Sequence, residues 1–327
     1  MRPQYERAGR VKRFGVAIAI LALTGFACGE ANTQASAPGG STDALAGEIA
    51  IDGSSTVFPI AQAVSEDFQI DNPDVKVSVG FAGTGGGFEA FCAGDTDISN
   101  ASRPIEEEEA ACLDKAGIGY TEFQIGVDGL TIVTHTDSDW VDCIKFDQLK
   151  SIYEPKSKVA TWSDVDPSWP DDPIKIFGPD PDSGTYDYFA EEVADPDAEE
   201  PATRDDMTQS ADDNVLVQGV EGEQGSIGYF GFAYFEENAQ QLKALEVDDG
   251  ESGCVEPSAE TVKSNDYPLS RPLFFYVANS SASRPEVAAF VDFWVNNAAD
   301  YATAVGYVEA PTEADSANQE ALSSIDS

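Results

Sequence analysis

Apolar residues along this chain follow two spacings, one typical of strands and one typical of helices. From residue 48 onward, short apolar runs alternate with longer segments whose apolar positions recur on one helical face. In order, the pattern predicts strands at 49–51, 75–80, 96–99 and 118–125, and helices at 59–70, 88–93 and 104–115. This alternation opens with a βαβ unit and is typical of α/β proteins with mainly parallel sheets.

The same alternation resumes beyond residue 129. The predicted elements are a crossing strand at 130–134, a helix at 147–153, a loop at 161–173, a strand at 174–177, a helix at 183–193, an element from 215–219, a strand at 226–229, a return strand at 273–278 and a helix at 285–297. A chain that leaves one lobe near residue 129 and returns near 273 makes that lobe discontinuous, with two crossing strands as the hinge.

The composition and the predicted elements divide the chain into five regions. We expect a signal peptide at 1–27, a flexible tether at 28–46, a first lobe at 47–130 plus 272–310, a second lobe at 131–271 and an acidic tail at 311–327 with little to pack. Five basic residues precede the apolar run at 14–27, which is the layout of a secretory signal. That run is too short to span a bilayer.

Cys28 directly follows this apolar run and resembles the lipid-modified cysteine of bacterial lipoproteins. The alternative is cleavage near Ala27 that leaves Cys28 as a free thiol. Residues 30–45 are rich in Ser, Thr, Gly, Ala and Pro, so they read as a tether behind a membrane anchor.

The other four cysteines are Cys92, Cys112, Cys143 and Cys254. An even number in an exported chain predicts two disulfides, and three pairings are possible. We favour Cys92 with Cys112, which closes a short local loop, and hence Cys143 with Cys254. Buried free thiols are the alternative, whereas the spacing lacks the paired pattern of a zinc site.

The charge of the chain is strongly negative. Acidic residues number 60 against 18 basic ones, for a net charge of −42, yet the hydrophobic fraction of 42% is that of a folded protein. Because the acidic residues are spread along the chain, we expect a salt-rich source, where about 1 M salt reduces the Debye length to about 3 Å. An acidic binding surface is the alternative reading. The same charge disfavours nucleic acid as a partner.

Three stretches place hydroxyls and glycines where a predicted helix begins: 53–57, 83–87 and 182–185. Each can present backbone N–H groups and a hydroxyl to an anion, assisted by the helix dipole. Taken alone, such stretches are more often caps and turns. Arg103 adds a guanidinium that can hold two oxygens of an oxyanion, although a surface salt bridge with the acidic residues 106–109 is its simpler role.

Six short strings of the sequence, taken together, resemble those of a known family. The strings GSSTVFPIAQA, GFAGTGGGFEAF, DISNASRPI, DGLTIVTH, SGTYDYF and GSIGYFGFAYF occur in this order between residues 47 and 307. They resemble the phosphate-binding proteins of bacterial phosphate-specific ABC transporters. The resemblance implies an α/β periplasmic-binding-protein-like fold of type II, with two lobes joined by a two-strand hinge. It also implies a monomer that captures inorganic phosphate outside the cytoplasm and passes it to ABC-transporter permease subunits, without a cofactor.

The family's anion-binding positions carry over onto particular residues here. The resemblance nominates hydroxyls and backbone N–H groups of Ser55, Thr56, Val57, Thr84, Gly85, Ser183, Gly184 and Thr185. Many relatives have an aspartate where this chain has Arg103 and an arginine near the position of Pro179. We therefore expect the arginine to have moved to the other lobe.

A carboxylate in the site would accept a hydrogen bond from protonated phosphate and repel sulfate, which has no proton to donate. Asp187, one turn into the helix after the SGT turn, is the first candidate, and Asp128 is the second. Asp187 has two other roles open to it, a salt bridge to Arg103 or a favourable charge near the helix N-terminus.

Two other classes of function remain open at this stage. A sensor or surface protein could use the same fold for another oxyanion, since fold alone does not determine function. A secreted hydrolase is the third reading, but its triad would depend on His135, the one histidine, and the SGT turn lacks the G-x-S-x-G elbow. We therefore expect no catalytic residue and no metal site.

Overall fold

The chain is organised around one long strand, β4 (Tyr120–His135), which takes part in both halves of a nine-stranded sheet. The computed structural model describes residues 44–181, 183–198 and 201–325, all within one compact unit. Cys28, the predicted signal peptide and most of the predicted tether lie outside the described residues. The sheet order is β2-β1-β3-β11-β4-β8-β6-β7, with β9 also paired to β4.

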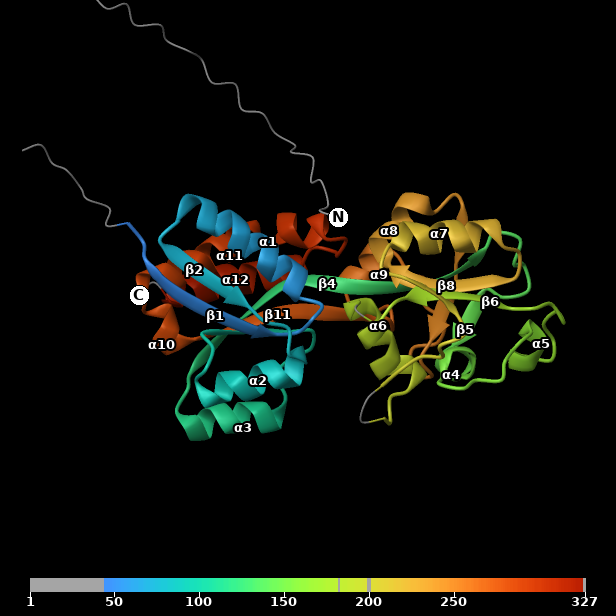
Figure 1. The fold of residues 1–327 in the computed structure, drawn as a ribbon, viewed down its shortest axis with the longest axis horizontal. Coiled ribbons are helices and arrows are strands. Elements are labelled where there is room, and N and C mark those ends of the chain that lie inside the picture. Colours follow the sequence, from blue (N-terminus) through green and yellow to red (C-terminus); the bar gives the residue numbers. More distant parts are fainter. Residues whose placement is uncertain (1–43, 182, 199–200, 326–327) are drawn as a thin grey trace, which may run out of the picture. The chain divides into compact units, whose positions relative to one another are not determined.

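The first lobe, which we define as residues 44–129 and 270–325, is a sheet covered by helices on both faces (Figure 1). Its elements are β1 (Gly47–Gly53), α1 (Phe58–Asp71), β2 (Val75–Val79), α2 (Gly83–Ala93), β3 (Ile98–Ala101), α3 (Glu107–Ala116), the first part of β4, β11 (Ser270–Ala278), α10 (Asn279–Ala282), α11 (Pro285–Ala304) and α12 (Thr312–Ile325). One hydrophobic core lies under α1 and α11, and a smaller one lies under α2 and α3.

The second lobe, residues 130–269, repeats this layered arrangement (Figure 1). Its elements are the rest of β4, β5 (Cys143–Lys145), α4 (Phe146–Tyr153), α5 (Trp162–Val165), β6 (Lys175–Pro179), α6 (Gly184–Phe189), the π-helical η1 (Ala190–Ala194), β7 (Thr208–Ser210), α7 (Asp213–Gly222), β8 (Ser226–Gly231), α8 (Phe232–Asn238), β9 (Leu242–Ala244), β10 (Glu246–Asp248) and α9 (Ala259–Lys263). Of the described helices, none combines the length and apolar character needed to span a bilayer.

The strand that leaves the first lobe, β4, is continuous, whereas the sequence pattern predicts two separate strands at 118–125 and 130–134. The first part of β4 pairs with β11, and from Leu130 onward β4 pairs with β8 instead. The chain returns beside this point, because the N–H of Leu130 donates to the carbonyl of Leu269, the residue before β11. Two strands therefore link the lobes, and residues near this link can contact both.

The strand directions are more mixed than the alternation of elements predicts. The outer pairs are parallel, as in β1 with β2 and β3 and β6 with β7 and β8. The pairs made by β4 and β11 are antiparallel. The reason is that one of these two strands leaves the first lobe and the other returns to it.

Residues after Pro311, expected to have little to pack, form α12 against the first lobe. Leu322 is buried in the larger core of that lobe. The amide of Asn318 pairs with the backbone of Gln124 in β4, accepting from its N–H at 3.1 Å and donating to its carbonyl at 2.7 Å. Asn318 on α12 thus satisfies two backbone groups of β4. The acidic composition of this segment did not indicate a packed helix.

Replacing Asn318 with alanine is expected to lower the free energy of unfolding by about 1–3 kcal/mol, because two backbone groups of Gln124 lose their partner. Urea denaturation would measure this. Gln319→Ala, which removes an exposed amide from the same helix, is the matched control and should change stability little. Equal stability of the wild type and the Asn318 variant would contradict the role of this amide.

Each lobe contains one disulfide, and the favoured pairing of the four cysteines is confirmed. Cys92 bonds to Cys112, joining α2 to α3, and Cys143 bonds to Cys254, joining β5 to the segment after β10. Glu246 lies near the second disulfide, and these three residues are the one group of metal-ligand types that the described part of the chain brings together. Both sulfurs are engaged in the disulfide, so they are not available as thiolate ligands.

Candidate functional site

A cleft of about 540 Å³ lies between the two lobes beside the crossing strands. Both lobes contribute to its walls, and the residues that line it include Ser54, Ser55, Thr56, Thr84, Gly85, Ser102, Arg103, Asp187, Tyr188, Glu191, Glu192, Ser270 and Arg271. Six of the residues nominated from the sequence are among them: Ser55, Thr56, Thr84, Gly85, Arg103 and Asp187. Hydroxyls and charged groups dominate this set, as expected for a polar ligand.

The loop between β1 and α1 brings Ser55 and Thr56 to the cleft. β1 ends at Gly53, where a Cβ atom would come within 2.1 Å of the Asn100 carbonyl, so the turn requires glycine. The hydroxyl of Ser54 accepts from the N–H of Val57 at 3.4 Å. Val57 itself is fully buried in the core and does not line the cleft, so its nominated N–H is turned toward Ser54.

The glycine-rich stretch forms the first turn of α2 and is held against β1. Asp52 accepts from the N–H groups of Gly53 and Ala82, at 2.8 and 2.9 Å. Thr84 follows on the cleft side, where its hydroxyl lies 3.2 Å from that of Ser102 and accepts from the Ser102 N–H. Both hydroxyls therefore lie on the first-lobe wall.

Gly85 lies on the first-lobe wall of the cleft, and the fold leaves room for a side chain at this position. An added Cβ atom would meet nothing within 4 Å, so we expect Gly85→Ala to stabilise the protein by about 0.5–1 kcal/mol. If an anion approaches this backbone, the same methyl should weaken its binding by roughly ten- to a hundredfold.

Thermal unfolding and calorimetric titration together measure both effects. Gly222→Ala on α7 is the matched control, because its Cβ atom would also meet nothing within 4 Å and it does not line the cleft. A Gly85 variant with unchanged affinity would remove Gly85 from the anion site.

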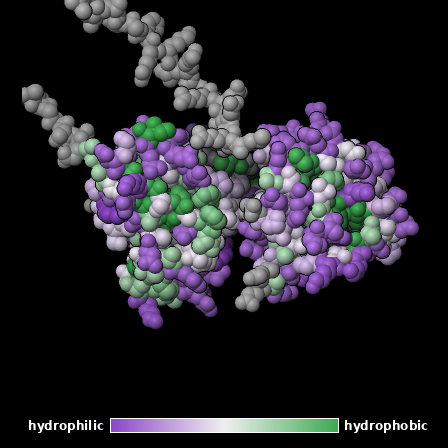
Figure 2. Space-filling view, viewed as in Figure 1, coloured by the Kyte–Doolittle hydropathy of each residue, from purple (hydrophilic) through white to green (hydrophobic). Residues whose placement is uncertain are grey.

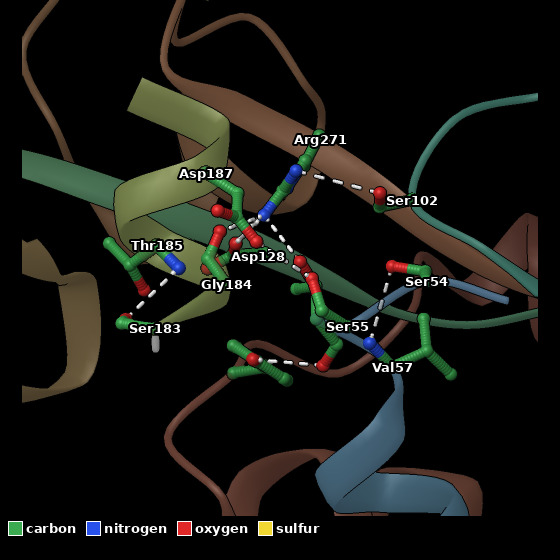
Figure 3. A network of polar contacts seen from close by, with 12 residues as sticks. Ser54, Ser55, Val57, Ser102, Asp128, Ser183, Gly184, Thr185, Asp187 and Arg271 are labelled. Carbon is green, nitrogen blue, oxygen red and sulfur yellow. Dashed lines mark hydrogen bonds and ion pairs between the residues drawn. The ribbon is translucent and has the colours of Figure 1, made fainter. Parts of the chain in front are cut away.

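The SGT turn of the second lobe lies directly against the first-lobe loop (Figure 3). Ser183 caps α6 by accepting from the N–H of Thr185 at 3.2 Å. A Cβ atom at Gly184 would come within 2.9 Å of the Thr56 hydroxyl, so only glycine permits this approach. Asp187 accepts from the Ser55 hydroxyl at 3.1 Å, which is a direct contact between the lobes.

Arg271, which the sequence pattern did not nominate, occupies the centre of these contacts (Figure 3). One terminal nitrogen donates to the Thr56 hydroxyl at 2.6 Å and to the Gly184 carbonyl at 2.9 Å. The guanidinium also lies 3.9 Å from the ring centre of Tyr188. Arg271 is 8% exposed at the base of the cleft and contacts both lobes.

Asp128 on β4 holds Arg271 from behind. Its carboxylate accepts from the Arg271 Nε at 3.2 Å, while its other oxygen has no partner among the described residues. Asp128 is fully buried and does not line the cleft. Burial raises the pKa of Asp128, and the charge of Arg271 opposes that shift. Asp128 thus orients a cation without facing the ligand space.

Arg103 lines the cleft but is engaged by carboxylates of its own lobe. Its guanidinium donates to both oxygens of Glu109, at 2.9 and 2.7 Å, and its Nε lies 3.2 Å from Glu106. The hydrogen bonds that Arg103 donates to Glu109 raise the pKa of Arg103. This is the surface salt bridge that the sequence offered as its simpler role. The cation in contact with both lobes is Arg271.

Asp187 keeps a carboxylate in the cleft without a basic partner at ion-pair distance among the described residues. Burial raises its pKa, while the hydrogen bond from Ser55 and the charge of Arg271 oppose the shift. The bridge to Arg103 that the sequence left open is not formed. His135 lies at the end of β4, outside the cleft lining, and its Nδ1 accepts from the N–H of Asp137.

Comparison with known proteins places this geometry in a family. The model of the PBP superfamily domain matches residues 32–298. The protein SphX of Synechocystis is 43% identical over 309 residues, 93% of this chain and 87% of its own. The phosphate-binding protein PstS of Staphylococcus saprophyticus is 48% identical over 232 residues, 70% of each chain. The crystal structure of a possible phosphate binding protein from Planctomyces limnophilus matches with a TM-score of 0.83 and 45% identity, over 86% of this chain and 99% of that one.

Proposed function

The chain belongs to the PBP superfamily, and from that premise we propose that it captures inorganic phosphate in the cleft and delivers it to an ABC importer. The observation that carries this proposal is that one buried arginine at the base of the cleft, Arg271, donates to the Thr56 hydroxyl of the first lobe and to the Gly184 carbonyl of the second. Capture and release by movement at the hinge involve no chemical conversion, so the protein is a transport component and not an enzyme.

Phosphate would be held by short-range donors that offset the negative charge of the chain. In this proposal the hydroxyls of Ser55, Thr56 and Thr84 contact it from the first lobe. The turn Ser183, Gly184 and Thr185 is not part of the cleft lining, and in this proposal it contacts the anion from the second lobe through its position against Thr56. Arg271 supplies the positive charge at the base of the cleft, because a guanidinium can hold two oxygens of an oxyanion. Arg103 lies on the wall with its charge already paired to Glu109.

Asp187 is the carboxylate best placed to accept the proton of phosphate. It lines the cleft, it has no basic partner at ion-pair distance among the residues that the structure describes, and its contact with Ser55 keeps it at the boundary between the lobes. A sulfate ion has no proton to share at neutral pH, so the same carboxylate would repel it. Asp128 is a weaker candidate because it does not line the cleft.

The protein acts outside the cytoplasm, as periplasmic binding proteins do. We further propose that residues 1–27 are a signal peptide and that Cys28 carries a lipid anchor, on the composition of the sequence around it. The spread of acidic residues supports a salt-rich source, since concentrated salt screens their mutual repulsion. On this view the protein works as a monomer that meets the permease subunits at the membrane.

Isothermal titration of the purified protein, freed of carried-over anion and kept in about 1 M salt, tests this function directly. Tight binding of one phosphate per chain, with no heat from sulfate, is the expected result. Folded protein that gives no heat with phosphate would exclude phosphate capture and redirect the search to other oxyanions.

A further inference from the structure

Both positive charges of the cleft are already paired with carboxylates outside it. Arg271 and Arg103 are the basic side chains among the described residues that line the cleft. Asp128 lies 3.2 Å from Arg271, and Glu109 lies 2.7 Å from Arg103. Neither Asp128 nor Glu109 lines the cleft. The two arginines therefore bring little net positive charge to an anion that arrives there.

Three further carboxylates face the anion space from the second lobe. Asp187, Glu191 and Glu192 line the cleft from α6 and η1, and none of them has a basic partner within ion-pair distance in the part of the chain that the structure describes. Asp187 is half-buried, whereas Glu191 and Glu192 are exposed on the cleft wall. Their charges repel a bound dianion, and water screens part of this repulsion. Hydrogen-bond donors alone leave this repulsion in place.

Glu191 is the one of these carboxylates best placed to respond to the anion. It follows Asp187 by four residues, so the two side chains lie on one helical face toward the cleft. Asp187 receives a hydrogen bond from Ser55 that stabilises its charge, and Glu191 receives none from the described residues. Around Glu191 lie Arg271 of β11, Arg103 after β3, and Asp187 and Glu192 of its own helix.

The charges of these neighbours decide the direction of the response. Burial on the cleft wall raises the pKa of Glu191, as do Asp187 and Glu192, while Arg271 and Arg103 lower it. A dianion in the cleft adds negative charge beside Glu191 and engages Arg271. Both changes favour the neutral acid, which can then donate a hydrogen bond to an anion oxygen.

We propose that capture of the phosphate dianion is coupled to the uptake of a proton by Glu191, which makes this residue a determinant of the charge state that the site accepts. The inference rests on the proposed function. The balance is simple: the protein, one hydrogen phosphate dianion and one proton from solvent form a complex in which Glu191 is a carboxylic acid. Affinity then falls as pH rises through the pKa that Glu191 has in the complex.

Calorimetric titration with phosphate in two buffers of different ionisation enthalpy counts the protons taken up. The titrations are repeated from pH of about 5 to about 8, and within this range the wild type is expected to take up a proton on binding that Glu191→Gln does not. Glu191→Gln should bind phosphate more tightly than the wild type at the upper end of the range, by roughly tenfold, because it has lost a like charge. The affinities of the two proteins should converge as the pH is lowered, because protonation of Glu191 removes the charge that distinguishes it from glutamine.

Glu237→Gln, an exposed position on α8, is the matched control for the loss of one negative charge and should behave as the wild type. Phosphate binding without proton uptake in the wild type would overturn the inference while leaving phosphate capture intact. Uptake that persists in Glu191→Gln would place the proton on the anion and likewise overturn it. No phosphate binding by the wild type would end both proposals together.

Discussion

Replacing Arg271 with alanine is expected to weaken phosphate binding by about 3–5 kcal/mol, which is more than about 100-fold in Kd. Arg271 is buried at the base of the cleft and contacts Thr56 and Gly184 from opposite lobes. Its loss removes the positive charge and also a contact that joins the lobes. Titration calorimetry would measure the change.

The same substitution leaves Asp128 buried without its cation, which is expected to destabilise the fold by about 3–5 kcal/mol. Arg271→Ala combined with Asp128→Asn avoids this, because the remaining side chain is neutral. We expect the double variant to fold and still to bind phosphate poorly. Arg271→Lys keeps the charge but loses the planar fork, so its affinity should fall between these extremes.

Arg103→Ala is the matched control for loss of a cleft arginine. Because its guanidinium is held by Glu109 and Glu106, we expect a smaller loss of affinity than at Arg271. The sequence alone nominated Arg103 as the main cation, so the two variants compare that hypothesis with the structural one. Normal affinity after Arg271→Ala, with a severe loss after Arg103→Ala, would return the role to Arg103.

Replacing Asp187 with asparagine is expected to reduce the preference for phosphate over sulfate by at least about 100-fold. The neutral amide no longer repels an unprotonated dianion, and its NH₂ group can donate to a sulfate oxygen. Direct titration with sulfate, and phosphate titration in the presence of sulfate, would measure the change. Because shape and size are preserved, folding should be unaffected.

Asp128→Asn separates the two candidate carboxylates. Asp128 contacts Arg271 from behind the cleft, so its replacement should alter phosphate affinity with little change in selectivity. Selectivity that is lost in the Asp128 variant and kept in the Asp187 variant would identify Asp128 as the proton acceptor.

Much of the fold could be predicted because it depends on neighbours in sequence. The apolar spacing of 59–70 predicts α1, and the structure extends that helix to Phe58–Asp71. The hydroxyls of Ser55, Thr56 and Thr84, which line the cleft, were nominated by the family resemblance in stretches that have the composition of helix starts. The family resemblance is confirmed by the match to the PBP superfamily domain, and the disulfide pairing is confirmed by the structure.

Predictions that needed distant contacts were less successful. The acidic composition of the last residues conceals α12, whose buried Asn318 pairs with Gln124, 194 residues away in sequence. The continuous β4 was predicted as two strands because the change of partner at Leu130 leaves no local trace in the composition. Both elements are stabilised by tertiary packing, which outweighs local propensity.

The sequence by itself determined the alternation of strands and helices, the loops that present hydroxyls and the resemblance to phosphate-binding proteins. Only the tertiary structure decided which arginine lies between the lobes. Arg103 is six residues from Glu109, close enough for a local ion pair. Arg271 is 143 residues from Asp128 and 215 from Thr56, so its contacts arise only when β11 returns beside β4. Side-chain chemistry is encoded locally, whereas the partner that each charge meets depends on the folding of the whole chain.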